Sequence, residues 1–167
     1  IIKTLFFILL IAIITISSII VLKNNYEDTE QERIIEQVTD TAYQKNDTDD
    51  YKTENININM KSLYEQNKDI IAWIRINNSN INYPIMQTKN NPNFYLRKNF
   101  YKAYSYYGTP YLSEQCNINT SDNLIVYGHH IKNSKMFGEL ENYKRQEYYN
   151  NHKIVNIYTL NDKRKYE

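Results

Sequence analysis

The first apolar segment of the chain is long, uninterrupted and bounded by lysines. Residues 4–22 carry no charge, are dominated by Ile, Leu and Phe, and lie between Lys3 and Lys23. As a helix, which rises 1.5 Å per residue, this segment is about 28 Å long, close to the hydrocarbon thickness of a bilayer. A cleavable signal peptide would have a shorter apolar core followed by a small-residue cleavage site, but this run continues past Ser17 and Ser18. The pattern favours an uncleaved transmembrane signal anchor over residues 1–23, with the rest of the chain outside the membrane.

The next segment combines helical periodicity with many charges. Residues 27–44 carry apolar side chains at helical spacing, at Ile34, Ile35, Val38 and Ala42. We expect a surface helix or stalk there. Residues 46–55 are polar and rich in Asp and Asn, which is typical of a linker. Residues 24–56 are therefore predicted to join the anchor to a domain that spans residues 57–167.

The pattern of residues 57–167 is that of short strands separated by turns. Apolar residues alternate or run together in short segments, bounded by clusters rich in Asn, Ser, Gly and Pro. Strands are predicted at residues 71–76, 81–86, 107–112, 124–127 and 153–160, with a further strand opening at residue 163. Short helical stretches are predicted at residues 60–67, 91–100 and 136–149. The apolar run at 124–127 predicts a buried strand, and Pro84 predicts a sheet edge or a bulge. The fold class is therefore mainly β with short helices.

Composition and charge narrow the function classes. The formal net charge is +1, which gives none of the strong positive field that nucleic-acid binding requires. The single cysteine, Cys116, cannot form an internal disulfide. The three histidines, His129, His130 and His152, do not have the spacing of a standard zinc site, and no Cys or carboxylate completes one. We predict neither a metal nor another cofactor, and we interpret Trp73 and the many tyrosines as packing residues.

The residues with the strongest chemical signal follow the apolar run at 124–127. Gly128 permits a close turn at the end of that strand, and His129 would then stand at the rim of a sheet. A histidine titrates near neutral pH and suits general acid–base catalysis. Spacing alone favours an ordinary surface histidine, so the pattern by itself leaves both interpretations open. On a strand His130 would point to the opposite face, and we interpret it as a loop residue without a shared role.

Several motifs, in order along the chain, resemble those of class B sortases. The stretch Asn-Leu-Ile-Val-Tyr-Gly-His-His-Ile-Lys-Asn-Ser-Lys-Met-Phe at residues 123–137 resembles the histidine motif of this family. Residues 67–76 resemble its first helix-to-strand passage, and Ile-Asn-Tyr-Pro-Ile-Met-Gln at residues 81–87 resembles its Ile-x-Tyr-Pro-Val-Val-Gln segment. Two further matches follow in the same order, at residues 93–96 and 108–109. The resemblance covers about residues 60–160.

This resemblance implies a sortase β-barrel and a transpeptidation reaction in which His129 is the catalytic histidine. In that reaction a cysteine thiolate attacks a threonine carbonyl in a sorting signal near the C-terminus of a secreted protein. The acyl-enzyme then passes to an amine of the cell-wall peptidoglycan. A nearby imidazolium favours the thiolate, the histidine protonates the leaving amine, and an arginine stabilises the oxyanion. The implied partners are sorting-signal peptides, a peptidoglycan amine and the membrane, with the catalytic domain on its extracytoplasmic side.

The chain departs from the family pattern in the residues that would complete the site. The family cysteine lies on a late strand in a Thr-Leu-x-Thr-Cys setting and is followed by the arginine, and neither setting occurs before Glu167. Cys116 lies upstream of His129 in a polar loop and does not match this nucleophile, so we interpret it as a free loop thiol. Arg145 and Arg164 match no catalytic position. We therefore expect this chain to be the N-terminal part of a sortase and to be inactive by itself.

Two other interpretations stay open. The chain is also compatible with a catalytically incomplete, membrane-tethered relative that binds sorting-signal peptides. Ser113, which stands where class B relatives tend to have an aspartate, adds to the departures. A bitopic surface protein with an unrelated β-domain is the third interpretation, and it predicts that His129 can be replaced without effect.

Overall fold

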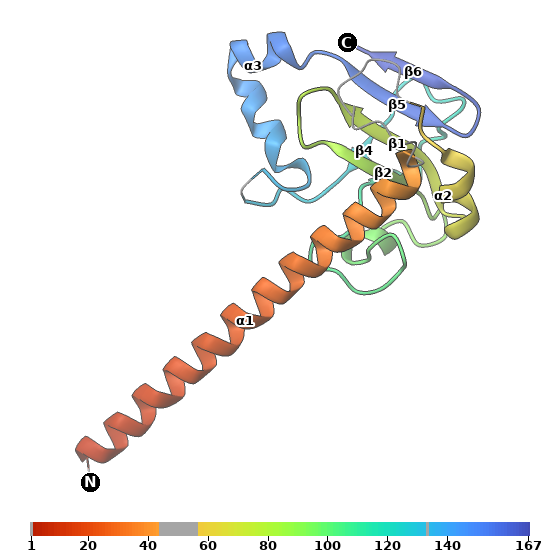
Figure 1. Ribbon diagram of the computed structural model, residues 1–167. Coiled ribbons are helices and arrows are strands. Elements are labelled where there is room, and N and C mark those ends of the chain that lie inside the picture. Colours follow the sequence, from red (N-terminus) through yellow and green to blue (C-terminus); the bar gives the residue numbers. More distant parts are fainter. Residues whose placement is uncertain (1, 44–56, 133) are drawn as a thin grey trace.

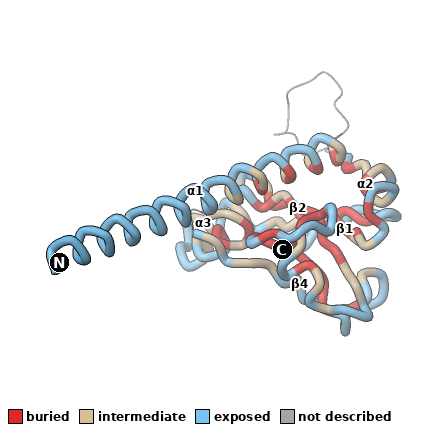
Figure 2. Tube along the Cα trace, turned by 90° about the horizontal axis from the view of Figure 1, so that it is seen from below, coloured by how far each residue is buried: buried red, intermediate tan, exposed pale blue. Residues whose placement is uncertain are grey.

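The N-terminal apolar segment is the first half of one long helix. The computed structural model describes residues 2–43, 57–132 and 134–167. Helix α1, Ile2–Tyr43, projects from the domain, and the side chains of its apolar half are exposed (Figures 1 and 2). Among the described helices, α1 is the one that is long and apolar enough to cross a membrane, judged by length and composition. The linker predicted at residues 46–55 lies outside the described residues.

The second half of α1 packs against the domain. Its buried residues are Gln31, Ile34, Val38 and Ala42. Their spacing of three or four residues places them on one face of the helix. That face joins a core cluster that includes Leu63 and Trp73. The predicted helical periodicity is confirmed, but the segment is not a free-standing stalk, because its apolar face is part of the core.

The domain is built on one six-stranded sheet with the order β4-β3-β2-β1-β5-β6. The strands are β1 (Ile70–Ile76), β2 (Asn82–Met86), β3 (Tyr111–Leu112), β4 (Val126–Tyr127), β5 (Val155–Thr159) and β6 (Lys163–Tyr166). Neighbouring strands are antiparallel except β2 and β3, which pair in parallel at Met86 and Tyr111. Pro84 pairs with Trp73 of β1, and the short pairing with β3 leaves the other side of β2 free of a strand at this position. The proline therefore interrupts no ladder, as expected for an edge position.

The central strand β1 separates two apolar clusters. Side chains on a strand alternate between the two faces of a sheet. Trp73 points into the cluster that α1 and helix α2 (Met60–Gln66) complete, which we call the closed face. Ala72, Ile74 and Ile76 point into the second cluster, which we call the open face. The open face borders a cavity of about 390 Å³, lined by side chains that include Ile74, Ile85 and Ile157.

Short helices and one buried tyrosine fix the loops around the sheet. Asn59 caps α2, its side chain accepting a hydrogen bond from the Ser62 backbone N–H at 3.0 Å. Three more short helices follow: η1 (Phe94–Arg97), η2 (Phe137–Lys144) and α3 (Gln146–Asn151). The Tyr95 hydroxyl, fully buried on η1, accepts from the Asn67 amide and donates to the Asp69 carboxylate, both at 2.8 Å. Burial raises the pKa of this hydroxyl well above its usual range, so it stays protonated and holds η1 in place.

Two predicted strands differ from the structure. The run at residues 124–127 forms only β4, and Ile125 and Tyr127 are 43% and 46% exposed, so the prediction of a buried strand is wrong. β4 is the edge of the described sheet, and its side chains alternate between half-buried and exposed. The strand predicted at 107–112 shortens to β3, because Gly108 adopts a positive φ of 61°. The other predicted strands and short helices are present, which confirms a mainly β fold with short helices.

Candidate active site

His129 stands directly beyond the edge strand β4, at the rim of the sheet. It is partly exposed, and its Nε2 lies 2.9 Å from the backbone carbonyl oxygen of Leu96. A carbonyl oxygen only accepts hydrogen bonds, so Nε2 carries the proton in this contact. The neutral ring then presents Nδ1 as its basic nitrogen. Leu96 O is the one hydrogen-bond partner of this ring among the described residues. The imidazole is oriented through one nitrogen and can exchange a proton through the other.

A tight hairpin after the strand holds the backbone of His129. The Phe137 N–H donates to the His129 carbonyl at 2.9 Å, and His130 forms a β-bridge with Met136. Gly128 lies directly under the Phe137 ring, because a Cβ at this position would be 2.5 Å from Phe137 Cδ2. No side chain larger than hydrogen fits there without moving the ring. Sequence reasoning assigned Gly128 to a close turn, whereas the structure shows that the missing side chain makes room for the Phe137 ring.

Met136 closes the hairpin in a strained conformation. Its φ of 51° and ψ of −126° lie in a region that L-residues rarely adopt, which costs on the order of 1–3 kcal/mol. The side chain is nevertheless buried, at 2% exposure, in the cluster of the open face. Burial of a methionine side chain is worth about 1.5–3 kcal/mol, comparable to that strain. Packing of its side chain therefore offsets the backbone strain at Met136.

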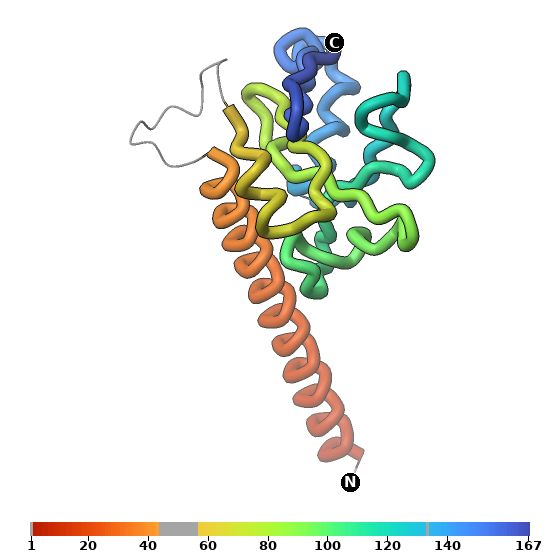
Figure 3. The backbone as a smooth tube through the Cα atoms, turned by 90° about the vertical axis from the view of Figure 1, so that its right-hand side faces the viewer, coloured from red at the N-terminus to blue at the C-terminus, as the bar shows by residue number. Residues whose placement is uncertain are grey.

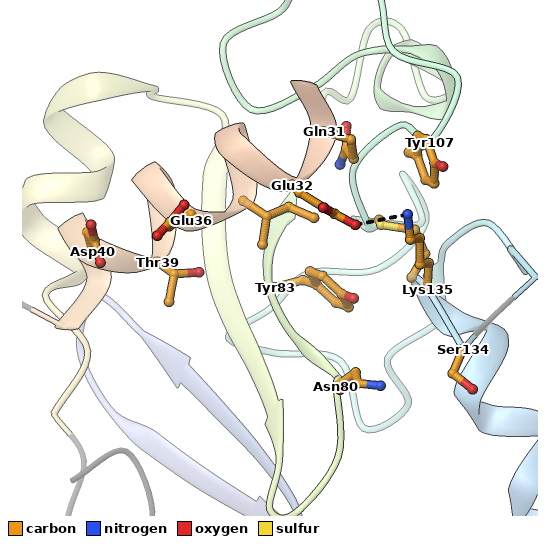
Figure 4. A pocket seen from close by; sticks show the side chains of 12 residues that line it. Gln31, Glu32, Glu36, Thr39, Asp40, Asn80, Tyr83, Tyr107, Ser134 and Lys135 are labelled. Atoms are coloured by element: carbon orange, nitrogen blue, oxygen red, sulfur yellow. Dashed lines mark ion pairs between the residues drawn. The ribbon is translucent and has the colours of Figure 1, made fainter. Parts of the chain in front are cut away.

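The hairpin also contacts α1. The Lys135 ammonium lies 3.0 Å from the Glu32 carboxylate and 3.7 Å from that of Asp28. Figure 4 shows the ion pair of Lys135 and Glu32 beside a cavity of about 490 Å³ between the helix and the hairpin, which Tyr83 also lines. Burial raises the pKa of the Tyr83 hydroxyl to about 12. These contacts connect the loop that carries His129 to the same helix that begins with the apolar segment.

The residues that face the His129 ring belong to η1 and to the segment that follows it. Gly108 lies against η1, because a Cβ there would be 2.5 Å from the Leu96 carbonyl oxygen. The Thr109 N–H donates to the Tyr95 carbonyl at 3.0 Å. The two short motifs at residues 93–96 and 108–109 therefore meet beside His129. Sequence reasoning missed the contact itself, because the partner is a backbone oxygen and carries no residue signature.

The other two histidines lie in separate surroundings. His130 is exposed, and its Nε2 is 3.4 Å from a Glu141 carboxylate oxygen. His152 stacks on the Tyr148 ring, with the centroids 3.8 Å apart and the planes within 10°. Both of its ring nitrogens contact backbone carbonyls, those of Tyr148 and Asn78. Within residues 2–43, 57–132 and 134–167, no three metal-binding side chains gather.

Cys116 and the two arginines do not complete the site. Cys116 is only 7% exposed, and its Sγ lies 3.5 Å from the backbone oxygen of Asn123. The loop that carries it is fixed by the Gln87 amide, which donates to the Ser113 and Cys116 carbonyls at 2.8 and 2.9 Å. Arg164 bonds Asp162, and Arg145 lies over the Tyr148 ring. Ser113 is buried as well. Cys116 is thus a free thiol in a loop, as predicted, and its side chain is buried.

Comparison with known proteins shows that the chain is similar in sequence to sortase B. No family model matches the chain. Sortase B of Staphylococcus aureus is 35% identical over 103 residues, which cover 61% of this chain and 42% of that protein. Sortase B of Listeria monocytogenes is 31% identical over 109 residues, covering 60% of this chain and 43% of that protein. The chain is homologous to sortase B. It matches less than half the length of either sortase B relative.

Solved sortase B structures share the fold of the chain. Sortase B from Bacillus anthracis superimposes with a TM-score of 0.71 at 26% identity, covering 84% of this chain and 66% of that one. The S. aureus sortase B–substrate complex gives 0.65 at 26% identity, covering 86% and 63%. A sortase B structure complexed with triglycine gives 0.66 at 25% identity, covering 85% and 63%. The coverage above 80% of this chain extends the sortase B likeness beyond the residues matched in sequence.

Proposed function

We propose that the protein is a membrane-anchored, sortase-type cysteine transpeptidase in which His129 is the general acid and base. The observation that carries this proposal is the position of His129 in a domain homologous to sortase B. It lies at the sheet rim, with Nε2 held by Leu96 O and Nδ1 available for proton exchange. The close contact of Gly128 with Phe137 and the buried Met136 support it, because they hold the backbone on both sides of the hairpin that begins at His129.

The chemistry needs a thiolate and a proton donor that act in turn. The thiolate attacks the carbonyl carbon of the scissile peptide, the C–N bond breaks, and the imidazolium of His129 gives its proton to the leaving amine. An incoming amine then attacks the thioester, gives a proton back to the imidazole, and releases the thiolate. We assign neither the nucleophile nor an oxyanion-stabilising arginine to this chain. Cys116 is packed against Asn123 O, which makes it unsuited to reach a carbonyl.

The substrates we propose are a sorting-signal peptide and a peptidoglycan amine. The support is the pair of complexes reported for sortase B relatives, one with a substrate and one with triglycine. A triglycine chain offers the free α-amino group that an acyl-enzyme requires as acceptor. We propose that the protein joins surface proteins to the cell wall through this exchange.

The anchor we propose is the apolar half of α1, with the domain on the extracytoplasmic side of the membrane. This half is exposed along its whole length, and water would solvate those side chains poorly. Because the helix continues into the core of the domain, the catalytic domain would stay close to the lipid surface.

A second function, peptide binding without catalysis, is favoured by the burial of the chain's single cysteine. In that case the protein that carries this sequence would bind a fluorescent sorting-signal peptide without releasing a cleavage product. The two functions are distinguished by incubating the protein with the peptide and triglycine, and following both bound peptide and ligated product by mass spectrometry.

The decisive test uses two neighbouring histidines in the protein that carries this sequence. Replacing His129 by Ala should lower the transpeptidation rate by about 10²–10⁴-fold, the usual contribution of a general acid–base group. The matched variant His130→Ala, whose ring only meets Glu141 at the surface, should keep the rate within about twofold. Cys116→Ala should also leave it unchanged. Equal rates for the two histidine variants would remove His129 from the mechanism.

A further inference from the structure

Three exposed tyrosines gather where α1 leaves its apolar half. Tyr26 on the helix is 71% exposed, and Tyr104 and Tyr106, on the loop that follows η1, are 65% and 49% exposed. All three line one cavity of about 290 Å³ together with Lys23 and Glu27. We call Tyr26, Tyr104 and Tyr106 the tyrosine patch. Figures 1 and 3 both place the loop at the end of the domain nearest the apolar half of the helix.

The loop is fixed to the helix rather than free to swing away. The Ser105 hydroxyl donates to the Gln31 side-chain oxygen at 2.8 Å, and both residues are buried. The Arg97 guanidinium donates to the Tyr106 carbonyl at 2.7 Å and lies over the Tyr106 ring. Because α1 continues without a break from residue 2 to residue 43, the loop has a fixed height along the helix axis.

That height can be measured from Leu22, the last residue of the apolar run. Helical rise is 1.5 Å per residue, so Tyr26 lies about 6 Å beyond Leu22 along the axis, and Gln31 about 13 Å beyond it. Each headgroup layer of a bilayer is roughly 5–8 Å thick, the difference between the full thickness and the hydrocarbon core shared by two leaflets. Ser105 is held at the level of Gln31, and Tyr104 and Tyr106 line the same cavity as Lys23 and Tyr26, so their side chains reach back toward the headgroup layer.

From this placement we infer that the tyrosine patch lies in the phospholipid headgroup layer and seats the domain on the membrane surface. The inference rests on the proposed membrane anchor. Tyrosine suits this layer because its ring is apolar while its hydroxyl forms hydrogen bonds with water, and it is enriched at membrane interfaces for that reason. Nearby acidic side chains are neutralised within the protein: Glu27 by Lys23 at 3.8 Å, and Glu30 by Arg33 at 2.6 Å. Repulsion from headgroup phosphates is therefore weak.

The inference also gives the site an orientation. The patch loop follows η1, and the carbonyl of Leu96 in η1 holds His129. A domain seated through Tyr104 and Tyr106 would hold this histidine in one fixed relation to the lipid surface. A substrate whose C-terminal end is still in the membrane would then reach the site without the domain having to turn.

The test places a fluorescent side chain at the predicted depth. Residues 1–167 are reconstituted in phosphatidylcholine vesicles, some containing phosphatidylcholine with a spin label on its headgroup. The fluorescence of the new tryptophan in Tyr104→Trp is obtained by subtracting the emission of the parent protein, which comes from the buried Trp73. In vesicles with the spin label this fluorescence should be lower by roughly half or more than in unlabelled vesicles, because the quencher acts at short range in the interface. Tyr106→Trp should behave in the same way. The matched control is Tyr101→Trp, in the same loop and 45% exposed, whose hydroxyl contacts Gln66 beside the far end of α1. Its emission should stay nearly constant.

Anchoring is checked in the same vesicles by extraction with alkaline carbonate. Protein that stays in the pellet, with Tyr104→Trp and Tyr106→Trp quenched and Tyr101→Trp unquenched, supports the inference. Protein that stays in the pellet with all three variants equally unquenched, or equally quenched, overturns the tyrosine patch while leaving the anchor intact. Protein that is extracted overturns the anchor and the patch together.

Discussion

The two faces of strand β1 differ in what packs against them. On the closed face, Trp73 packs beneath α1 and α2, and its indole N–H donates to the Asn82 side chain at 2.7 Å. On the open face, Ile74 borders a cavity of about 390 Å³. The closed face needs a helix that begins in the apolar segment, and the open face leads to the hairpin of His129. The comparison teaches that helix α1 belongs to the core of the domain on one face, while the candidate chemistry lies beyond the other face.

The largest expected effect is on the closed face. Trp73→Ala should lower the free energy of unfolding by about 3–5 kcal/mol, because it removes a fully buried ring and leaves a cavity. The matched substitution on the open face, Ile74→Ala, should cost at or below the lower end of about 2–5 kcal/mol, since its surroundings are already hollow. Urea unfolding of the two variants in detergent measures both values. Equal losses would mean that the two faces are equally well packed.

A smaller effect is expected where the open face meets the hairpin. Gly128→Ala places a Cβ 2.5 Å from the Phe137 ring, so the ring must move, at a cost of about 1–3 kcal/mol. Transpeptidation should fall along with stability, because His129 follows directly. The double variant Gly128→Ala/Phe137→Ala makes room for the methyl group. If it recovers no activity relative to Phe137→Ala alone, the contact between Gly128 and Phe137 is not what positions the histidine.

The smallest effect is a pH dependence at the surface of η2. The hydrogen bond from Lys144, followed by the contact with His130, holds the pKa of Glu141 below its usual value of 4.5. A carboxyl group with a depressed folded-state pKa stabilises the fold above the unfolded pKa, and this contribution is lost as the pH falls through the folded value. Glu141→Gln should therefore make stability slightly less dependent on pH below about 4.5. Thermal unfolding followed between pH 3 and pH 7 tests this, and parallel curves for variant and parent would contradict it.

Much of the fold could be predicted from the residues because period and turns are local properties. The strand at Ile70–Ile76 and the helical face with Ile34 and Val38 follow from spacing alone. The exposure of β4 could not be predicted, because a short apolar run has the same sequence pattern in an edge strand as in a central strand. For the candidate site, the motif at residues 123–137 is what made His129 the predicted catalytic histidine, and this role stays a prediction. The contact of His129 with Leu96 O was not predicted, because a backbone oxygen that comes from a distant turn leaves no mark in the side-chain pattern.

The unbroken course of α1 has a consequence for how the chain tolerates insertions and deletions. Successive residues of an α-helix are rotated by about 100° around its axis, with 3.6 residues per turn. One residue added between Lys23 and Glu27 would therefore turn the whole domain by about 100° relative to the apolar segment, although no contact inside the domain would change. Seven residues, close to two full turns, would restore the direction and shift the domain by about 10 Å. The number of residues between Leu22 and Gln31 thus sets the direction in which the candidate site faces.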